Sequence, residues 1–302
     1  MCRTMARCSL CNREYDVVDM VETISRKRGN RVHYMCQDCA SRNRGYHTSN
    51  NEVVGVSKQN QVKCGIEFES SFTDEYARNA IFEYGFIPTH DGSLNSDGYS
   101  DRYGWDGNSC EYVSPIMQGL NKPSKFALTC DHLMQGEHLK INNSCGTHFH
   151  VSVNDMRDHR GNKTYIGYIQ RFYHSLFIPL NEAIASDRQK AEKVFGRYFN
   201  SYAKQIDFNA SPEYDRYLWI NVKNDSNIEF RLNRFTSGKQ YQNLMKMEVE
   251  MVKCIVSNFC EHFMDTEWDR TRYEKRTHYR KHKAEVTARK LVKIYEKYSA
   301  NC

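Results

Sequence analysis

Three short segments of this chain each place two ionisable side chains around a phenylalanine. Residues 67–69, 148–150 and 229–231 read Glu-Phe-Glu, His-Phe-His and Glu-Phe-Arg. In a β-strand, successive side chains point to opposite faces, so each ionisable pair shares one face and its phenylalanine points to the other. A sheet built from these strands would have one face with three glutamates, two histidines and an arginine, and an apolar face packed under helices. The polar face would suit divalent metal ions together with phosphate.

The surrounding pattern predicts a mixed fold. Alternating apolar residues predict strands at residues 62–69, 110–115, 146–153, 218–222 and 227–232. Helical spacing predicts helices at residues 74–84, 125–135, 166–185, 191–202, 239–264 and 270–298. Adjacent strands mixed with blocks of helix indicate the α+β class, with an antiparallel sheet and helices on one side. Residues 96–108, dense in Gly, Asp and Tyr, are expected to form a loop over the site.

Four of the 12 cysteines form two Cys-x-x-Cys pairs around a 24-residue insert. They are Cys8, Cys11, Cys36 and Cys39. The insert predicts two strands, residues 15–24 and 31–35, so the four thiolates are expected to hold a structural Zn²⁺ in a zinc ribbon. Free thiols or a redox pair are the alternatives. The other cysteines are scattered and read as buried structural thiols, with a catalytic thiol at Cys145 as the alternative.

Composition divides the chain into four parts. The ribbon spans residues 1–45, a linker rich in Ser, Asn, Arg and Gly spans 46–61, the main domain spans 62–265, and a basic C-terminal helix spans 266–302. With 302 residues, 39% hydrophobic and 26% charged, the chain has a globular composition and can bury a large core.

The net charge of +6 is unevenly distributed. Residues 1–50 carry nine Lys and Arg against five Asp and Glu, residues 268–302 carry eleven against four, and the middle carries 23 against 28. An acidic middle suits a domain that gathers cation ligands. The basic ends predict either solvated faces or contact with nucleic acid or an acidic protein.

Hydropathy predicts a protein without membrane contact. No apolar run approaches the roughly 20 residues that span a bilayer, and the N-terminus lacks the apolar stretch of a signal peptide. We therefore expect an intracellular, cytoplasmic location.

Taken singly, each polar pair has an ordinary explanation. Glu-x-Glu is commonly a solvent-facing edge, His-x-His can be a hydrogen-bonded core pair, and Glu-x-Arg is commonly a surface salt bridge. Three such pairs in one chain, with Glu111 as a further candidate, favour a shared site. Its oxygen-rich ligand set indicates Mg²⁺ or Mn²⁺, and the imidazoles favour Mn²⁺.

The order of these motifs resembles a known family. Gly-Ile-Glu-Phe-Glu at 65–69, Glu-Tyr-Val-Ser-Pro at 111–115 with Gly119, Cys-Gly-Thr-His-Phe-His-Val at 145–151 and Ile-Glu-Phe-Arg at 228–231 are similar to the motifs of the amidoligases. That family belongs to the carboxylate–amine ligase superfamily of glutamine synthetase and glutamate–cysteine ligase. The resemblance covers residues 62–260. It implies a curved antiparallel sheet whose concave face binds ATP and two or three Mg²⁺ or Mn²⁺ ions.

The resemblance also implies roles for single residues. The metal ligands it implies are Glu67, Glu69, Glu111 and Glu229, with His148 and His150 as metal or nucleotide-phosphate contacts. It makes Arg231 a phosphate contact and Arg197 a further substrate or phosphate arginine, so that Glu67, Glu69, Arg231 and Arg197 form the catalytic set. The chain departs from the family pattern in its single proline after Val113-Ser114 and in its N-terminal ribbon.

The implied activity is that of an ATP-dependent carboxylate–amine ligase. It would form an amide through an acylphosphate, on a small-molecule, peptide or protein substrate. Two alternatives remain: a zinc-ribbon nucleic-acid-binding protein with a non-catalytic ligase-like body, and a metal-dependent hydrolase with the same ligands.

Overall fold

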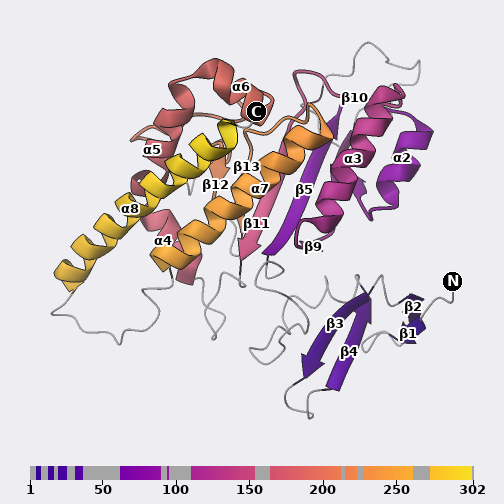
Figure 1. Cartoon of the computed structure of the whole chain (residues 1–302), viewed down its shortest axis with the longest axis horizontal. Helices are drawn as coiled ribbons and strands as arrows, with labels where there is room; N and C mark the ends of the chain where they lie inside the picture. The colour runs from indigo at the N-terminus through magenta and orange to yellow at the C-terminus, as the bar shows by residue number, and fades with distance from the viewer. Residues whose placement is uncertain are drawn as a thin grey trace. The chain divides into compact units, whose positions relative to one another are not determined.

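The chain comprises two compact units, Met1–Gln61 with His159–Asn162, and Val62–Asp158 with Lys163–Cys302. The computed structural model describes residues 5–7, 13–16, 20–25, 31–36, 62–89, 94, 110–153, 164–211, 215–222, 227–260 and 273–300. Figure 1 shows the described helices and strands in order along the chain.

The first unit contains two antiparallel strand pairs. Strand β1 (Met5–Arg7) pairs with β2 (Glu14–Asp16), and β3 (Met20–Ser25) pairs with β4 (Arg31–Cys36). The predicted hairpin is present as β3 and β4. The single strand predicted at residues 15–24 is wrong, because its two parts pair with different partners.

The predicted zinc site falls outside this description. Cys8, Cys11 and Cys39 lie outside the described residues, and so does the side chain of Cys36 at the end of β4. The zinc ribbon therefore stays a prediction. The predicted linker at residues 46–61 and the loop at 96–108 also lie outside the described residues.

The second unit is built on a seven-stranded antiparallel sheet. Its strands are β5 (Val62–Ser70), β7 (Ile87–Thr89), β8 (Cys110–Val113), β9 (Met117–Gln118), β11 (Thr147–Val153), β12 (Ile220–Asn221) and β13 (Ile228–Phe230). Their order is β12-β13-β11-β5-β8-β7, with β9 also paired to β5. A separate pair joins β6 (Phe72–Thr73) and β10 (Leu139–Lys140). The predicted antiparallel sheet is confirmed.

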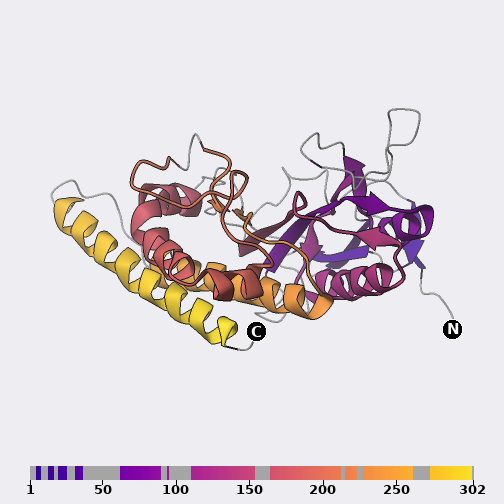
Figure 2. The same ribbon diagram turned by 90° about the horizontal axis from the view of Figure 1, so that it is seen from above.

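Helices complete the second unit. They are α2 (Glu75–Phe82), α3 (Asn121–Gln135), α4 (Thr164–Arg171), α5 (Tyr173–Ala185), α6 (Arg188–Phe195), α7 (Gly238–Ile255) and α8 (Tyr273–Ser299), and a π-helical turn (Val256–Cys260) extends α7. Helices α3 and α7 pack against each other and α7 packs on β11, while α8 packs on α5 and α7 (Figure 2). Mixed helix and antiparallel sheet confirm the α+β class.

Two predicted helices differ from those in the structure: one is shorter and the other is divided in two. The helix predicted at residues 191–202 ends at Phe195, because Gly196 adopts a left-handed conformation with φ of 77°. A side chain on Gly196 would also collide with the carbonyl of Arg234. The helix predicted at 166–185 is divided into α4 and α5 at Phe172.

The phenylalanine of each polar triplet lies in the core, as the alternation predicts. Phe68, Phe149 and Phe230 are at most 1% exposed. The ring of Phe68 contacts Phe126 of α3 edge-on, with centroids 5.4 Å apart. Burying a side chain of this size stabilises the fold by about 1.5–3 kcal/mol, so these residues anchor the strands while their neighbours face the opposite side.

None of the described helices has the length and apolar character needed to cross a membrane.

Candidate functional site

Strand register brings the predicted ligands together on one face of the sheet. Three pairs lie directly opposite one another on neighbouring strands: Glu67 with His148, Glu69 with Glu111, and Glu229 with His150. Side chains that face each other across an antiparallel pair lie close enough to interact. The six residues therefore form a continuous polar patch over β8, β5, β11 and β13.

Glu67 lies at the centre of this patch. Its Oε2 atom is 2.8 Å from His148 Nδ1, and its Oε1 atom is 3.2 Å from His150 Nε2. Burial disfavours the ionised form of Glu67, but its interactions with the two histidines outweigh that cost and lower its pKa well below the usual range. Glu67 is therefore a carboxylate held between two imidazoles.

His150 has a nitrogen available for a further ligand. Its Nε2 atom is buried and lies 3.2 Å from Glu67 Oε1, within ion-pair distance, but it has the geometry of a hydrogen bond with none of the described residues. Burial opposes protonation of the ring, yet Glu67 and Glu229 raise the pKa of His150 above its ordinary value. A buried imidazole nitrogen beside carboxylates fits a cation site.

Two overlapping groups of side chains could each hold a metal ion. Glu67, Glu111 and His148 form one, and Glu67, His150 and Glu229 form the other; within each, the ligand atoms lie within 4.8 Å of one another. Each group has two carboxylates and one imidazole, and the two share Glu67. This donor set fits Mn²⁺, which accepts both ligand types, and its oxygens fit Mg²⁺.

The environment of Glu111 also suits a bound cation. Burial raises its pKa, and the neighbouring charges of Glu67 and Glu69 add to that effect, against an opposing hydrogen bond that Thr89 Oγ1 donates to Glu111 Oε2 at 2.8 Å. A divalent cation would supply the positive charge that favours the ionised carboxylate.

Glu69, a predicted metal ligand, belongs to neither group among the described residues. It is 5% exposed and accepts a hydrogen bond from the backbone N–H of Gly146. Its Oε1 atom lies 3.8 Å from His148 Nε2. A Cβ atom on Gly146 would lie 3.0 Å from Arg197 Nη2 and 3.3 Å from Glu69 Oε2, so a larger residue there would require one of these side chains to shift.

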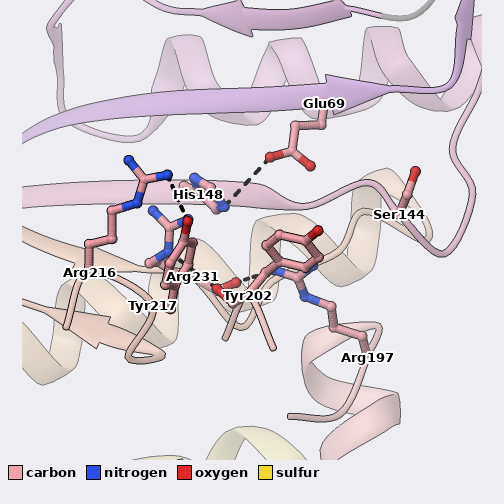
Figure 3. A pocket seen from close by; sticks show the side chains of 8 residues that line it. All are labelled: Glu69, Ser144, His148, Arg197, Tyr202, Arg216, Tyr217 and Arg231. Carbon is pink, nitrogen blue, oxygen red and sulfur yellow. Dashed lines mark hydrogen bonds and ion pairs between the residues drawn. The ribbon is translucent and has the colours of Figure 1, made fainter. Parts of the chain in front are cut away.

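Glu69 faces a pocket beside the two groups. Among the described residues, the pocket is lined by Glu69, Ser144, His148, Arg197, Tyr202, Arg216, Tyr217 and Arg231. Figure 3 shows two of these side chains, Glu69 on β5 and His148 on β11, which lie next to each other in the pocket wall. The pocket encloses about 90 Å³. That volume suits one phosphate- or carboxylate-sized group, since sites for drug-sized ligands are several times larger.

Arg231 connects the pocket with the second metal-ligand group. Its Nη1 atom donates to Glu229 Oε1 at 2.5 Å, and Asn221 Nδ2 donates to the other oxygen of Glu229 at 2.9 Å. Glu229 and Arg231 were predicted to share one face of a strand, and their side chains are in contact, although β13 itself ends at Phe230.

Arg197 lines the pocket but is largely occupied in holding the backbone. It is 7% exposed and donates to the carbonyl oxygens of Leu232 at 3.3 Å, Cys145 at 3.5 Å and Arg231. Burial lowers its pKa to about 10, with the charge of Glu69 opposing, so the guanidinium stays charged at neutral pH. These bonds join the ends of β11 and β13.

Four pocket residues were not predicted from the sequence: Ser144, just before the motif at 145–151, and Tyr202, Arg216 and Tyr217. Arg216 donates to Tyr217 Oη at 2.8 Å, and its guanidinium carbon lies 4.8 Å from the centre of that ring. The rings of Tyr202 and Tyr217 meet edge-on at 6.1 Å. Their segments carry no motif, and a basic–aromatic dipeptide before a strand is the one signal that could have indicated them.

Cys145, the alternative nucleophile, is a buried thiol. Burial raises its pKa to about 11, and a hydrogen bond to Asn142 opposes that shift only in part. A thiol that stays protonated at neutral pH is a poor nucleophile. Its position before β11 is therefore explained by packing.

Comparison of the chain with protein-family models finds no match, and neither does comparison with curated proteins.

Proposed function

We propose that the chain is an ATP-dependent carboxylate–amine ligase with a glutamine synthetase-like catalytic sheet and two or three bound Mg²⁺ or Mn²⁺ ions. The observation that carries the proposal is a pair of carboxylate–imidazole groups that share Glu67, next to a pocket lined by three arginines. Phosphoryl transfer depends on positioning and on positive charge around the phosphate oxygens. The two groups would position the phosphate through bound metal ions, and the arginines would supply positive charge.

The proposed metal sites use the two groups directly. Glu67 would join two ions, with Glu111 and His148 on one side and His150 and Glu229 on the other. When bound, the ions would offset negative charge on the phosphate oxygens of ATP.

The proposed reaction has two steps. A carboxylate oxygen of the first substrate attacks the γ-phosphorus of ATP, ADP leaves, and an acylphosphate forms. The amine nitrogen of the second substrate then attacks the acyl carbon, loses a proton, and releases phosphate to leave an amide. Arg231, held by Glu229 at 2.5 Å, would offset charge on the moving phosphoryl group. Glu69, at the pocket wall, would accept the proton of the amine.

The pocket's size supports a place for the reacting groups. A space of about 90 Å³ takes a phosphoryl or carboxylate group, so the adenosine of ATP would lie beyond the described lining. In this arrangement Arg197 holds the backbone around the pocket, and Arg216 at the exposed rim meets the incoming anion.

The N-terminal cysteines and the basic ends have proposed roles of their own. Cys8, Cys11, Cys36 and Cys39 would hold a structural Zn²⁺. The ribbon and α8 would then offer basic surfaces to nucleic acid or an acidic protein. Helix α8 buries Ala284, Ala288 and Leu291, so its exposed basic side chains lie on its other faces.

Turnover of ATP with a condensed product tests the ligase proposal. The purified protein is incubated with Mg²⁺ or Mn²⁺, ATP and pools of amino acids or peptides, and ADP, phosphate and products with the mass of a condensed pair are measured. Glu67→Gln should abolish ATP consumption. Glu250→Gln is a matched control, because Glu250 forms a surface ion pair with Lys297. Undiminished ATP consumption by Glu67→Gln would contradict the proposal.

A metal-dependent hydrolase is the second candidate, and the small pocket favours it. A space that fits a single phosphoryl group is sufficient for a phosphate ester whose remainder stays outside. Repeating the incubation with a phosphate ester and without ATP or an amine separates the two functions, because a hydrolase releases phosphate or another product without either of them.

A further inference from the structure

A fully buried acid lies behind the sheet, on the side opposite the candidate site. Glu248 of α7 has no exposed surface, and its Oε2 atom accepts a hydrogen bond from Asn233 Nδ2 at 3.2 Å. Asn233, which follows β13, is also fully buried. The remaining oxygens of both side chains, Glu248 Oε1 and Asn233 Oδ1, are buried and make no hydrogen bond with the described residues.

A single proton would satisfy both oxygens. An ionised carboxylate can only accept hydrogen bonds, and so can an amide oxygen, so the two atoms cannot pair when Glu248 is charged. A protonated carboxyl group can donate to Asn233 Oδ1 while it still accepts from Asn233 Nδ2. An unpaired buried charge is costly, whereas a neutral acid with two hydrogen bonds is not.

The surroundings of Glu248 also favour the neutral acid. Burial raises its pKa well above the ordinary value, and the hydrogen bond from Asn233 opposes this only in part. A titratable group that interacts with Glu248 is Tyr241 on α7, and Tyr241 interacts in turn with Cys64 on β5 and Cys130 on α3. Burial raises the pKa of each of these groups as well, so all three are neutral at neutral pH.

Asn233 is directly connected to the candidate site. Its carbonyl oxygen accepts a hydrogen bond from the backbone N–H of Thr147 at 2.9 Å, one residue before His148. Two residues earlier, the carbonyl of Arg231 accepts a hydrogen bond from Arg197. Residues 231–234 are thus held by Arg197 on the pocket side and by Glu248 on the helix side.

We propose that Glu248 is a neutral carboxylic acid in the folded protein, that it donates its proton to Asn233 Oδ1, and that this two-bond pair attaches residues 231–234 to α7. Glu248 acts here as a positioning residue for Arg231 and Thr147. This assignment does not depend on which reaction the site performs.

Infrared difference spectroscopy tests the protonation state directly. At neutral pH, the spectrum of the full chain minus that of Glu248→Gln should show the carbonyl band of a protonated carboxylic acid. Glu250→Gln, on the same helix, is the control: it removes a carboxylate 2.9 Å from Lys297 Nζ and should show carboxylate bands only. Carboxylate bands in the Glu248→Gln difference would overturn the proposal.

Unfolding at several pH values tests the same point independently. The amide of Gln can make both hydrogen bonds without taking up a proton, so Glu248→Gln should be more stable than the unmodified chain at neutral pH. Above the ordinary glutamate pKa of about 4.3, the unfolded state releases the proton that the folded state keeps. The unfolding constant of the unmodified chain, divided by that of Glu248→Gln, should therefore rise by up to about tenfold per pH unit. A ratio that does not change between about pH 5 and pH 8 would contradict a neutral Glu248.

Hydrogen exchange tests the positioning role. Glu248→Leu cannot pair with Asn233, and it should speed amide exchange at residues 145–149 and 231–234 more than within α3. Glu248→Gln should leave those segments protected. Asn233→Ala, which removes the other partner, should have the same effect on residues 145–149. Unchanged protection of these segments in Asn233→Ala or in Glu248→Leu would overturn the positioning role.

Discussion

His148 Nδ1 lies 2.8 Å from Glu67 Oε2, although the two residues are 81 positions apart in the sequence. Antiparallel pairing of β5 and β11 places them opposite one another, and the next pairing, of β11 with β13, places Glu229 opposite His150. One strand register thus assembles both groups of side chains that could hold a metal ion. A shift of one residue in β11 would turn both histidines into the core.

Replacing Glu67 by Gln should impair metal binding without unfolding the protein. Glu67 is shared by both groups, so its loss should weaken Mn²⁺ binding by more than about 100-fold. Its side chain is 29% exposed, so the fold should persist. Titration with Mn²⁺ followed by electron paramagnetic resonance measures the change. Glu75→Gln, at an exposed position of α2, should bind Mn²⁺ normally, and equal affinity in both variants would argue against a shared ligand.

Metal binding should weaken as the pH falls. Glu67 and Glu229 raise the pKa of His150 against the effect of burial, and a metal ion can bind the ring nitrogen only after the proton leaves. Affinity for Mn²⁺ should therefore rise with pH until it passes the raised pKa of His150, and binding should release protons. Calorimetry in buffers of different ionisation enthalpy counts those protons. Binding without proton release below neutral pH would contradict a role for His150.

Replacing Gly146 by Ala should disturb the pocket. The added Cβ would lie 3.0 Å from Arg197 Nη2 and 3.3 Å from Glu69 Oε2, so one of these side chains must move. We expect a loss of about 1–3 kcal/mol in the free energy of unfolding and reduced activity. Gly167→Ala is the control, since nothing lies within 4 Å of its Cβ and it sits in α4. That change should stabilise the protein by about 0.5–1 kcal/mol, as chemical denaturation would show.

Arg197 and Arg216 should differ in their effects on stability. Arg197→Ala leaves three backbone carbonyls, two of them buried, without this donor and should cost at least about 2 kcal/mol in the free energy of unfolding. Arg216 is exposed, so Arg216→Ala should change that free energy by less than about 0.5 kcal/mol while weakening binding of inorganic phosphate. Thermal unfolding and phosphate titration of both variants separate the roles. Similar losses of stability would refute the distinction.

The polar and apolar faces of the strands could be predicted because they depend on local geometry. Alternation along β5 alone places Phe68 in the core and Glu67 on the opposite face, whatever the neighbouring strand is. The end of α6 was harder to predict. Gly196 ends that helix through its left-handed conformation, while aromatic residues continue at helical spacing beyond it.

The sequence by itself determined which side chains share a face, since the period of a strand is fixed by its own backbone. It also singled out, together with Glu69, the residues of the two groups that could hold a metal ion. Only the tertiary structure decided which of these residues belong to which group, because register and strand order depend on packing between distant segments. It placed Glu69 in the pocket, assigned Arg197 to the backbone, and brought Arg216 and Glu248 to positions that no local pattern predicts.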